Sequence, residues 1–258
     1  MEKYRPIHLQ EIICSSQDAK ISKQITKLLS AGVIRKIAPR VYSSNLDEPI
    51  EGIIRRNLFQ ILGTIYPGTM LSHRSAFEFQ PTKTGQLFIT SSYTKKVKLP
   101  GITLQFLEGA SPIEGDNKFS GELYVSQKAR AFLENLQATK KLGSESKCLS
   151  LPEIEERLEQ IIRVNGEVEI NKLRDQARGI SEQLGMQQEF EKLNRDQKKV
   201  IKNSLRDFQL GGAELGDQEK ARFAQIQDEQ AILGKTYSDH VLDATDGFVH
   251  LVTNFEDL

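Results

Sequence analysis

The chain has 258 residues, of which 38% are hydrophobic and 27% are charged, so it has room for one large domain or for two to three small ones. Its 35 basic and 35 acidic side chains give a formal net charge of zero. This balance excludes an argument for nucleic-acid binding from overall charge, and only a local cluster of charges could support one.

Two further features concern the cellular compartment. Cys14 and Cys148 have no metal-type spacing, and two cysteines in a chain of this length suggest free thiols in a reducing compartment. No apolar run reaches membrane-spanning length, and no signal-peptide core follows Met1. We therefore expect a cytoplasmic protein with no membrane partner.

Residues 1–48 predict a winged helix-turn-helix, which is a DNA-binding fold. A first helix is expected in "HLQEIICSS", residues 8–16, and a second between Asp18 as N-cap and Gly32 as C-terminal cap. The inward face of the second helix is formed by Ile21, Ile25, Leu28 and Leu29. A β-hairpin with its turn near Ala38-Pro39 follows, because Pro has no backbone donor to lose at a turn.

Six basic side chains and no acidic one lie between Ala19 and Tyr42. They are Lys20, Lys23, Lys27, Arg35, Lys36 and Arg40. The three lysines fall at i, i+3 and i+7, so they share one helix face, offset from the apolar face. A basic helix followed by a basic hairpin is typical of phosphate contact, and Ser22 and Gln24 are candidates for phosphates or base edges. A solvated helix face is the competing interpretation, since most lysine runs are solvated.

Residues 49–138 predict a small α+β domain. One amphipathic helix is expected between Pro49 and Pro67, followed by a short helix capped by Ser72. Three β-strands are expected in "GQLFIT", "KKVKLP" and "ITLQFLE", residues 85–90, 95–100 and 102–108. A strand and then a helix capped by Ser126 are expected in residues 121–136.

The four histidines of the chain are His8, His73, His240 and His250, and none has metal-ligand spacing. His73 lies beside an arginine in a short predicted helix, where a lone histidine is more often structural than catalytic. We therefore expect no catalytic residue, no metal and no cofactor.

Residues 139–192 predict a linker and a helical connector. "ATKKLGSESKCLS", residues 138–150, is polar and typical of a linker. Ser150 and Glu153 match a capping box, which starts a helix that Gly166 ends. A second helix is expected from about Val168 to Leu184.

Three segments of this region resemble one known family. They are "LLSAGVIRKIAPRVYSSN", "IIRRNLFQILGTIYPGTMLSHRSAFEFQPTKTGQLFIT" and "KLPGITLQFLEG". They resemble the AbiEi-type antitoxin-like module, which also occurs at the N-terminus of some bacterial Fic-family proteins. The resemblance covers residues 15–137, and residues 154–194 look like the helical connector ahead of a Fic catalytic domain. It implies a winged-helix DNA-binding unit, with DNA and a toxin protein as partners. The His-Pro-Phe-x-x-Gly-Asn-Gly-Arg loop of a Fic enzyme is absent from the sequence.

Residues 193–258 predict an all-helical C-terminal region. A helix with Ile201, Leu205 and Phe208 inward is expected first, then a loop at Gly211-Gly212. A long helix follows from about Asp217, and residues 248–253 predict a short β segment. The apolar side chains of the long helix are Phe223, Ile226, Leu233, Tyr237 and Val241. Acids outnumber bases here, which disfavours a nucleic-acid surface.

The segments "NSLRDFQLGGAEL", "ARFAQIQDEQAILGKTYSDHVLDAT" and "LVTNFEDL" resemble the oligopeptidase A group of thimet oligopeptidase-type zinc metallopeptidases. That family hydrolyses peptides with a zinc ion held by a His-Glu-x-x-His helix and a downstream Glu, and neither is present here. The chain therefore looks like two truncated proteins joined near Leu193-Asn194. A recombination product, a pseudogene-like gene fusion and an assembly error all remain open.

These features predict an α+β protein: a winged helix-turn-helix, a small α+β domain and a helical C-terminal region. The expected function is non-catalytic DNA binding of antitoxin or regulator type. One alternative is an incomplete oligopeptidase A-type metallopeptidase, and another is an interaction protein that docks a toxin. The peptidase-like segment should leave apolar side chains unburied, namely Phe208, Phe223, Leu233 and Val241. Protease cleavage is expected near residue 145 and near Leu193.

Overall fold

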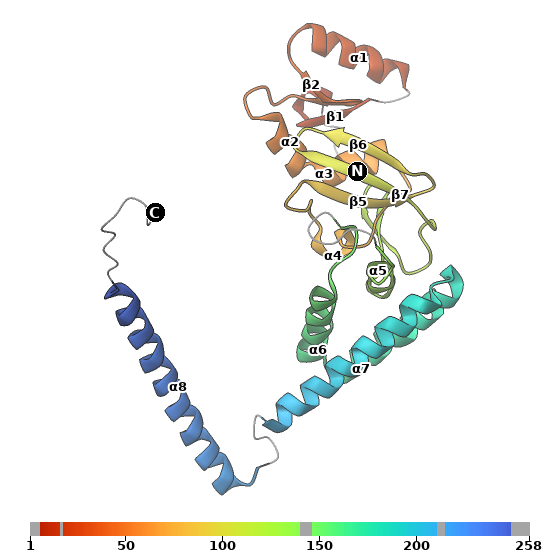
Figure 1. The fold of residues 1–258 in the computed structure, drawn as a ribbon. Coiled ribbons are helices and arrows are strands. Elements are labelled where there is room, and N and C mark those ends of the chain that lie inside the picture. The colour runs from red at the N-terminus through yellow and green to blue at the C-terminus, as the bar shows by residue number, and fades with distance from the viewer. Residues whose placement is uncertain (1–5, 16–17, 140–145, 211–214, 249–258) are drawn as a thin grey trace, which may run out of the picture. The chain divides into compact units, whose positions relative to one another are not determined.

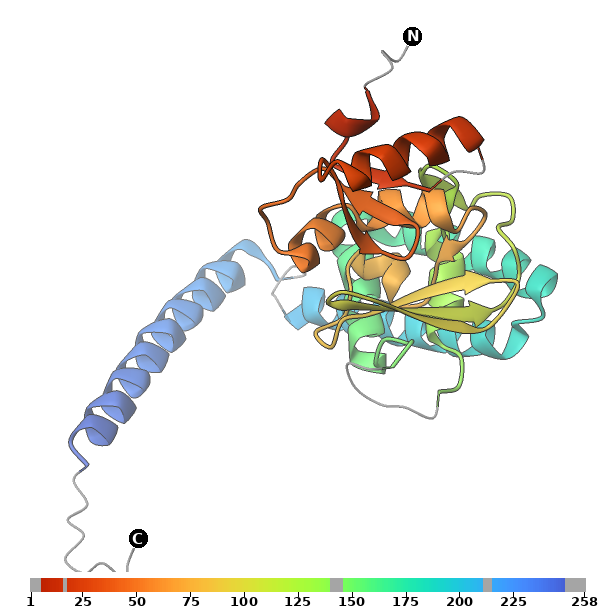
Figure 2. The ribbon, with the colours of Figure 1, turned by 90° about the horizontal axis from the view of Figure 1, so that it is seen from above.

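The computed structural model describes residues 6–15, 18–139, 146–210 and 215–248, and it shows a mixed α/β protein with eight α-helices and two β-sheets in these ranges (Figure 1). The chain forms two compact units, Met1–Ile201 and Lys202–Leu258. In unit 1, a small and a large sheet are interleaved with helices. Figure 1 shows α1 (Ala19–Ser30) at one end of this unit, and Figure 2 looks down on it from that end.

The first layer is a three-stranded antiparallel sheet with the order β1-β3-β2, covered by α1. Its strands are β1 (Ile12–Cys14), β2 (Arg35–Ala38) and β3 (Val41–Ser43). The predicted helix before Gly32 and the predicted hairpin are confirmed. The predicted first helix over residues 8–16 is wrong, because this stretch forms a 3-10 helix, η1 (Ile7–Leu9), and then β1.

The reason for the strand is visible in its burial. Ile12 packs into the main core of unit 1, whereas its neighbour Ile13 packs against α1 on the opposite face of the sheet. Successive residues point to opposite faces only in a strand, so two adjacent buried isoleucines favour β structure. Among the described residues of 6–48, a 3-10 helix and a strand precede α1, and no other α-helix does. The predicted helix-turn-helix pair is therefore not formed in these residues.

Helix α1 begins and ends as the sequence predicts. The Asp18 side chain accepts a hydrogen bond from the Lys20 N–H at 2.7 Å, and Gly32 has a φ of 67°. Ile25 is buried with Ile13 and Ile34, while Ile21 and Leu28 pack at the edge of the same cluster. Leu29 was predicted to face inward but is 41% exposed. It lies about 100° around the helix from Leu28, which takes it off the buried stripe.

The second layer contains two helices where the sequence predicts one. They are α2 (Ile50–Arg56) and α3 (Leu58–Ile65), separated at Asn57. The Asn57 side-chain amide donates to the Ile53 carbonyl at 2.9 Å and to the Glu11 carboxylate at 2.9 Å. The Asn57 N–H also donates to the Ile53 carbonyl at 3.2 Å, and the break is a local change of the backbone at Asn57, with a φ of −106° and a ψ of 15°.

The third layer is a six-stranded mixed sheet with the order β6-β7-β5-β4-β9-β8. Its strands are β4 (Met70–Leu71), β5 (Gln86–Ser91), β6 (Lys95–Leu99), β7 (Ile102–Glu108), β8 (Asn117–Ser120) and β9 (Leu123–Val125). β5 and β7 pair in parallel, as do β4 and β9. The three strands predicted between residues 85 and 108 are confirmed. Residues of α2 and α3 share one buried core with the inner faces of both sheets.

A second core lies among the helices that follow. It joins α5 (Lys128–Asn135), α6 (Leu151–Leu184) and α7 (Gln187–Leu210), while the short α4 (Ser75–Glu78) packs at its margin through Phe77. The Ser150–Glu153 capping box is confirmed, and Gly166, with a φ of 77° and a ψ of −179°, breaks α6 where predicted. Ser126 does not cap α5, because Gln127 holds that position and the Ser126 hydroxyl bonds Glu134 instead.

Helix α7 runs through Leu193-Asn194, where the sequence stops resembling the Fic-family connector and starts resembling oligopeptidase A. Leu193 is fully buried in the second core and Val200 is 1% exposed, so no structural break falls at Leu193. Unit 1 instead ends at Ile201. The point near Leu193-Asn194, where the Fic-like resemblance ends and the oligopeptidase A-like resemblance begins, therefore lies inside one continuous helix, α7.

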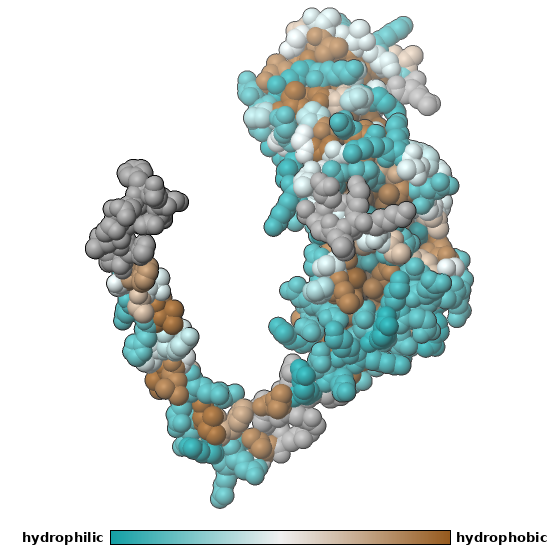
Figure 3. All heavy atoms as spheres, in the orientation of Figure 1, coloured by the Kyte–Doolittle hydropathy of each residue, from teal (hydrophilic) through white to brown (hydrophobic). Residues whose placement is uncertain are grey.

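In unit 2, α8 (Asp217–Asp246) is a long helix with Gly216 at its N-cap in place of the predicted Asp217. Its apolar side chains are exposed over most of its length, as the brown spheres along it show (Figure 3). Leu233 is 67% exposed and Val241 is 46% exposed, as predicted, whereas Phe223 is half-buried. The Phe208 side chain and the Gly211-Gly212 loop lie outside the described residues. Of the predicted β segment over 248–253, only Phe248 is described, and it is not in a strand.

Limited trypsin digestion should separate the two units after Ile201. Cleavage at Lys202, Arg206 or Lys220 is expected first, because a helix with few packed side chains opens readily. Lys192 and Arg195 flank the buried Leu193 and should resist cleavage. Intact-mass spectrometry of the resistant fragment checks this, and early cleavage at Lys192 would contradict the continuity of α7. The cleavage expected near residue 145 falls outside the described residues.

Candidate functional site

The lysines of α1 form an exposed basic surface. Lys20, Lys23 and Lys27 are all exposed, and they lie roughly 130° around the helix axis from the buried stripe. The packing of Ile25 against the small sheet holds the lysines outward. None of them forms an ion pair with a described residue. Ser22 and Gln24 are also exposed on α1, next to the lysines.

The hairpin contributes two more cations. Lys36 is exposed and lies directly across from Tyr42, whose ring packs on the α1 side of the sheet. Arg40 sits in the turn with a left-handed φ of 67°, and its Nε atom donates to the Ser15 hydroxyl at 3.3 Å. The side chain of Lys36 thus lies on the same side of the sheet as α1, and Arg40 marks the hairpin tip.

Arg35 differs from the other predicted cations. Its Nε atom donates to the Asn45 carbonyl at 2.9 Å, and its Nη2 atom donates to the Glu48 carbonyl. Arg35 therefore closes the loop that follows β3, and two of its five N–H donors bond carbonyl groups of that loop. We call Lys20, Lys23, Lys27, Lys36 and Arg40 the basic surface.

An acidic residue nearby is held away from this surface. Glu11 accepts hydrogen bonds from Arg56, from Asn57 at 2.9 Å and from Asn45 at 3.4 Å. These contacts, above all that from Arg56, lower the pKa of Glu11 to about 2. The Glu11 carboxylate thereby joins β1 to α2 and α3 and is not paired with the lysines.

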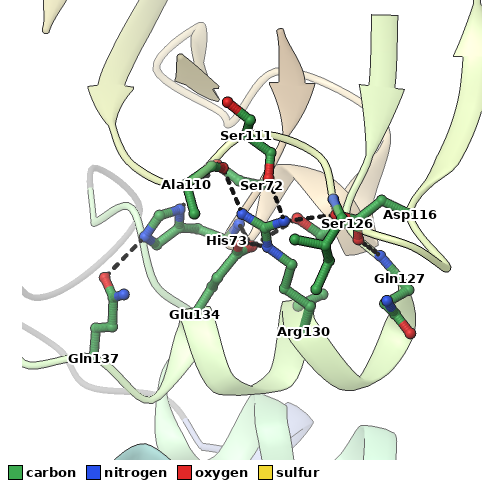
Figure 4. Close-up of polar contacts among 12 residues, drawn as sticks. Ser72, His73, Ala110, Ser111, Asp116, Ser126, Gln127, Arg130, Glu134 and Gln137 are labelled. Carbon is green, nitrogen blue, oxygen red and sulfur yellow. Dashed lines mark hydrogen bonds and ion pairs between the residues drawn. The ribbon is translucent and has the colours of Figure 1, made fainter. Parts of the chain in front are cut away.

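A second group of polar residues is buried beneath the large sheet (Figure 4). The Arg130 guanidinium, 2% exposed, donates to Asp116 Oδ2 at 2.6 Å and to Glu134 Oε1 at 2.8 Å. Glu134 Oε2 accepts from the Ser126 hydroxyl at 2.8 Å and from the His73 N–H at 3.1 Å. We call Arg130, Asp116 and Glu134 the buried triad.

The buried triad and the neighbouring His73 are hydrogen-bonded within the protein interior. Burial raises the pKa of Glu134, and burial lowers the pKa of His73 to about 3, so the imidazole is neutral at pH 7. The His73 ring is hydrogen-bonded to Ser72 and Gln137, and the Arg130 guanidinium also donates to the Ala110 carbonyl at 2.7 Å. The groups of this cluster are thus buried and hydrogen-bonded to one another, and the structural role expected for His73 stays a prediction.

A cavity with a volume of about 650 Å³ is lined by Arg74, Glu78, Cys148 and Glu153 among others. Its central cation is neutralised, because Arg74 pairs with Glu78 at 3.0 Å and with Glu153 at 3.4 Å. Burial raises the pKa of the Cys148 thiol, so it does not offer a reactive thiolate. The cavity therefore lacks an activated cysteine nucleophile.

Two negative findings concern the part of the chain that the structure describes. No group of three or more His, Cys, Asp or Glu side chains there is arranged to hold a metal ion. No helix within those same residues is long and apolar enough to cross a membrane.

Comparison with known proteins gives similarity over one short stretch. The chain is 44% identical over 66 residues to oligopeptidase A of Escherichia coli (strain K12), which is 26% of this chain and 10% of that protein. It is 42% identical over 66 residues to oligopeptidase A of Salmonella typhimurium and 40% identical over 70 residues to oligopeptidase A of Haemophilus influenzae. No protein-family model and no solved structure matches the chain.

The chain thus spans about a tenth of the length of the curated relatives it matches. The resemblance to oligopeptidase A over about a quarter of the chain is confirmed. The resemblance to the AbiEi-type module and to Fic-family proteins has no support from these comparisons and stays a prediction.

Proposed function

We propose that this chain is a non-enzymatic DNA-binding protein of the antitoxin or transcriptional-regulator type, which acts in the cytoplasm. The observation that carries the proposal is the basic surface, whose lysines are exposed and form no ion pair with a described residue. A toxin protein remains a predicted partner.

The spacing of the cations suits a duplex backbone. Lys20, Lys23 and Lys27 cover about 10 Å of the helix axis, and a duplex carries one phosphate charge per about 1.7 Å of its own axis, so the three lysines can each face a phosphate of one short stretch of duplex. Lysines on such a surface replace condensed counterions, which makes binding favourable and dependent on salt. Gln24 lies within about 60° of Lys20 and Lys27 around the helix axis, whereas Ser22 lies about 100° from Lys23. Both are exposed and are the candidates for contacts with base edges.

The proposed contact does not use a helix-turn-helix pair. Among residues 6–48 as described, α1 is supported by a β-sheet, so α1 itself would lie against the duplex with the β2–β3 hairpin beside it. Lys36 and Arg40 would then extend the phosphate contacts. Arg35 is assigned to loop closure and not to DNA.

The test compares two triple variants that each remove three exposed lysines. Lys20→Ala/Lys23→Ala/Lys27→Ala alters the basic surface, and Lys95→Ala/Lys96→Ala/Lys98→Ala alters β6. Binding to a fluorescent duplex is measured by anisotropy over a range of salt concentrations. The α1 variant should lower the slope of log affinity against log salt by about 3, or one per lysine. Equal slopes for both variants would overturn the assignment to α1.

A second candidate rests on the 44% identity to oligopeptidase A. We propose that the matching 66 residues are an incomplete peptidase segment without activity of their own. A fluorogenic peptide should not be cleaved by the full chain with added zinc. Cleavage that a chelator abolishes would favour a peptidase over a DNA-binding protein, and the anisotropy experiment would then show no binding.

A further inference from the structure

A small pocket opens between α4, α5 and the first half of α6. Its volume is about 260 Å³. The apolar part of its lining is formed by Phe77, Phe132, Ile161 and Val164, and the polar part by Lys128, Arg157, Gln160 and Asn165. None of these residues is used by the basic surface or by the buried triad.

The apolar wall of the pocket is buried on the side of Phe132 and exposed to solvent on the side of Val164. Phe132 is fully buried, and its ring meets the ring of Phe77 edge to face with the centroids 4.8 Å apart. Val164 is 71% exposed and lies in the last turn before the break of α6 at Gly166. An apolar group that entered the pocket would cover Val164 and rest on packed aromatic rings.

Arg157 is the unusual member of the lining. Its guanidinium lies over the Phe77 ring, 5.1 Å from the ring centroid. Its Nε atom is shielded from solvent and has no hydrogen-bond partner, although buried donors are nearly always satisfied. The carboxylate of Glu153, one turn earlier, already accepts from Ser150 and Arg74.

The charges around the pocket favour an anion. Lys128 is exposed at its rim, and no acidic residue is among those that line it. A carboxylate is planar and accepts two parallel hydrogen bonds from a guanidinium, so it would bond Arg157 and satisfy the Nε donor once the guanidinium turns that shielded atom toward the pocket.

We propose that this pocket binds a compound that carries a carboxylate next to an apolar group the size of a leucine or phenylalanine side chain. The carboxylate bonds Arg157 and is attracted by Lys128, and the apolar group lies between Phe77 and Val164. The volume is below the roughly 300–1,000 Å³ of sites for drug-sized ligands, which limits the bound part to one residue. Either a free acylated amino acid or the C-terminal residue of a peptide supplies this chemistry.

Isothermal titration calorimetry on the full chain tests the site. The probes are N-acetyl-L-phenylalanine, its uncharged amide, and the peptide Gly-Gly-Gly-Phe with a free C-terminus. The acid should bind at least tenfold more tightly than the amide. Binding of the peptide with equal affinity would indicate that the natural ligand is a peptide C-terminus, and binding of the small acid alone would indicate a free compound.

Two variants of α6, one inside the pocket and one outside it, show whether binding depends on the pocket or on the overall charge of the helix. Arg157→Gln should weaken binding of the acid at least tenfold, whereas Arg163→Gln, exposed on the same helix but outside the pocket, should leave it unchanged. Val164→Asp places a repelling charge at an exposed position and should also abolish binding, which keeps the test valid if Arg157→Gln disturbs folding. Equal affinity for acid and amide, or no binding of either acid tighter than about 1 mM, would overturn the proposal.

Discussion

Replacing Gly63 by alanine is expected to destabilise unit 1 by about 3 kcal/mol or more, at the upper end of the range for overpacking. Gly63 lies in α3, where that helix crosses the β8–β9 turn. A Cβ atom at this position would lie 2.0 Å from the carbonyl oxygen of Ser120. The obstacle is backbone, so no side-chain rotation relieves it, and α3 would have to move away from β9.

Gly52 provides the matched control. It lies in α2, is exposed, and a Cβ atom there would meet nothing within 4 Å. Gly52→Ala should be neutral or stabilise the protein by up to about 1 kcal/mol, because alanine favours the helix. Urea denaturation followed by circular dichroism measures both variants. Similar midpoints for Gly63→Ala and Gly52→Ala would show that α3 does not pack closely on the β8–β9 turn.

Local patterns in the sequence predict much of unit 1. The strands between residues 85 and 108, the hairpin after Gly32 and the capping box at Ser150 were all predictable from residues close to one another in the chain. Each depends on a short-range rule: alternation in a strand, a left-handed cap, or a carboxylate three residues after a serine. Gly166 follows the same logic, since its φ of 77° is favourable only for glycine.

The missed features depend on residues far apart in the sequence. Ile12 and Ile13 were predicted to face inward from one helix. They are instead buried on opposite faces of β1, Ile12 in the main core of unit 1 and Ile13 against α1, and the sequence near them does not show that both faces are covered. The break at Asn57 involves Glu11, which is 46 residues away. Leu193 coincides with a change in sequence resemblance, yet its burial is decided by α5 and α6.

In the candidate site too, some features follow from residues close together in the sequence and others depend on contacts between distant residues. Exposure of Lys20, Lys23 and Lys27 follows from helix periodicity and was predictable. The role of Arg35 was not predictable, because its acceptors are the main-chain carbonyls of Asn45 and Glu48. Every residue has a main-chain carbonyl, so the amino-acid sequence does not show which carbonyls an arginine will bond. Charge alone therefore identifies a basic segment, while the structure shows which of its cations already have partners.

Arg130 and Glu134 have the spacing of a solvent-exposed i, i+4 ion pair, which would contribute only about 0.5 kcal/mol. The structure places both in the buried triad, with side chains 2% and 6% exposed. Arg130→Ala is therefore expected to cost about 3–5 kcal/mol at pH 7, because it leaves two carboxylates buried without their cation. Arg163→Ala, at an exposed position of α6, should change the free energy of unfolding by less than about 0.5 kcal/mol.

The pH dependence distinguishes an uncompensated buried charge from a simple loss of packing. Burial raises the pKa of Glu134, and removal of Arg130 takes away the neighbour that opposes this rise. A group whose pKa is raised by folding favours the folded state most when it is protonated, so the Arg130→Ala variant loses stability as pH rises through that pKa. The difference in unfolding free energy from wild type should therefore shrink between pH 7 and pH 4.5. A difference that is constant over this range would mean that Arg130 acts mainly through packing.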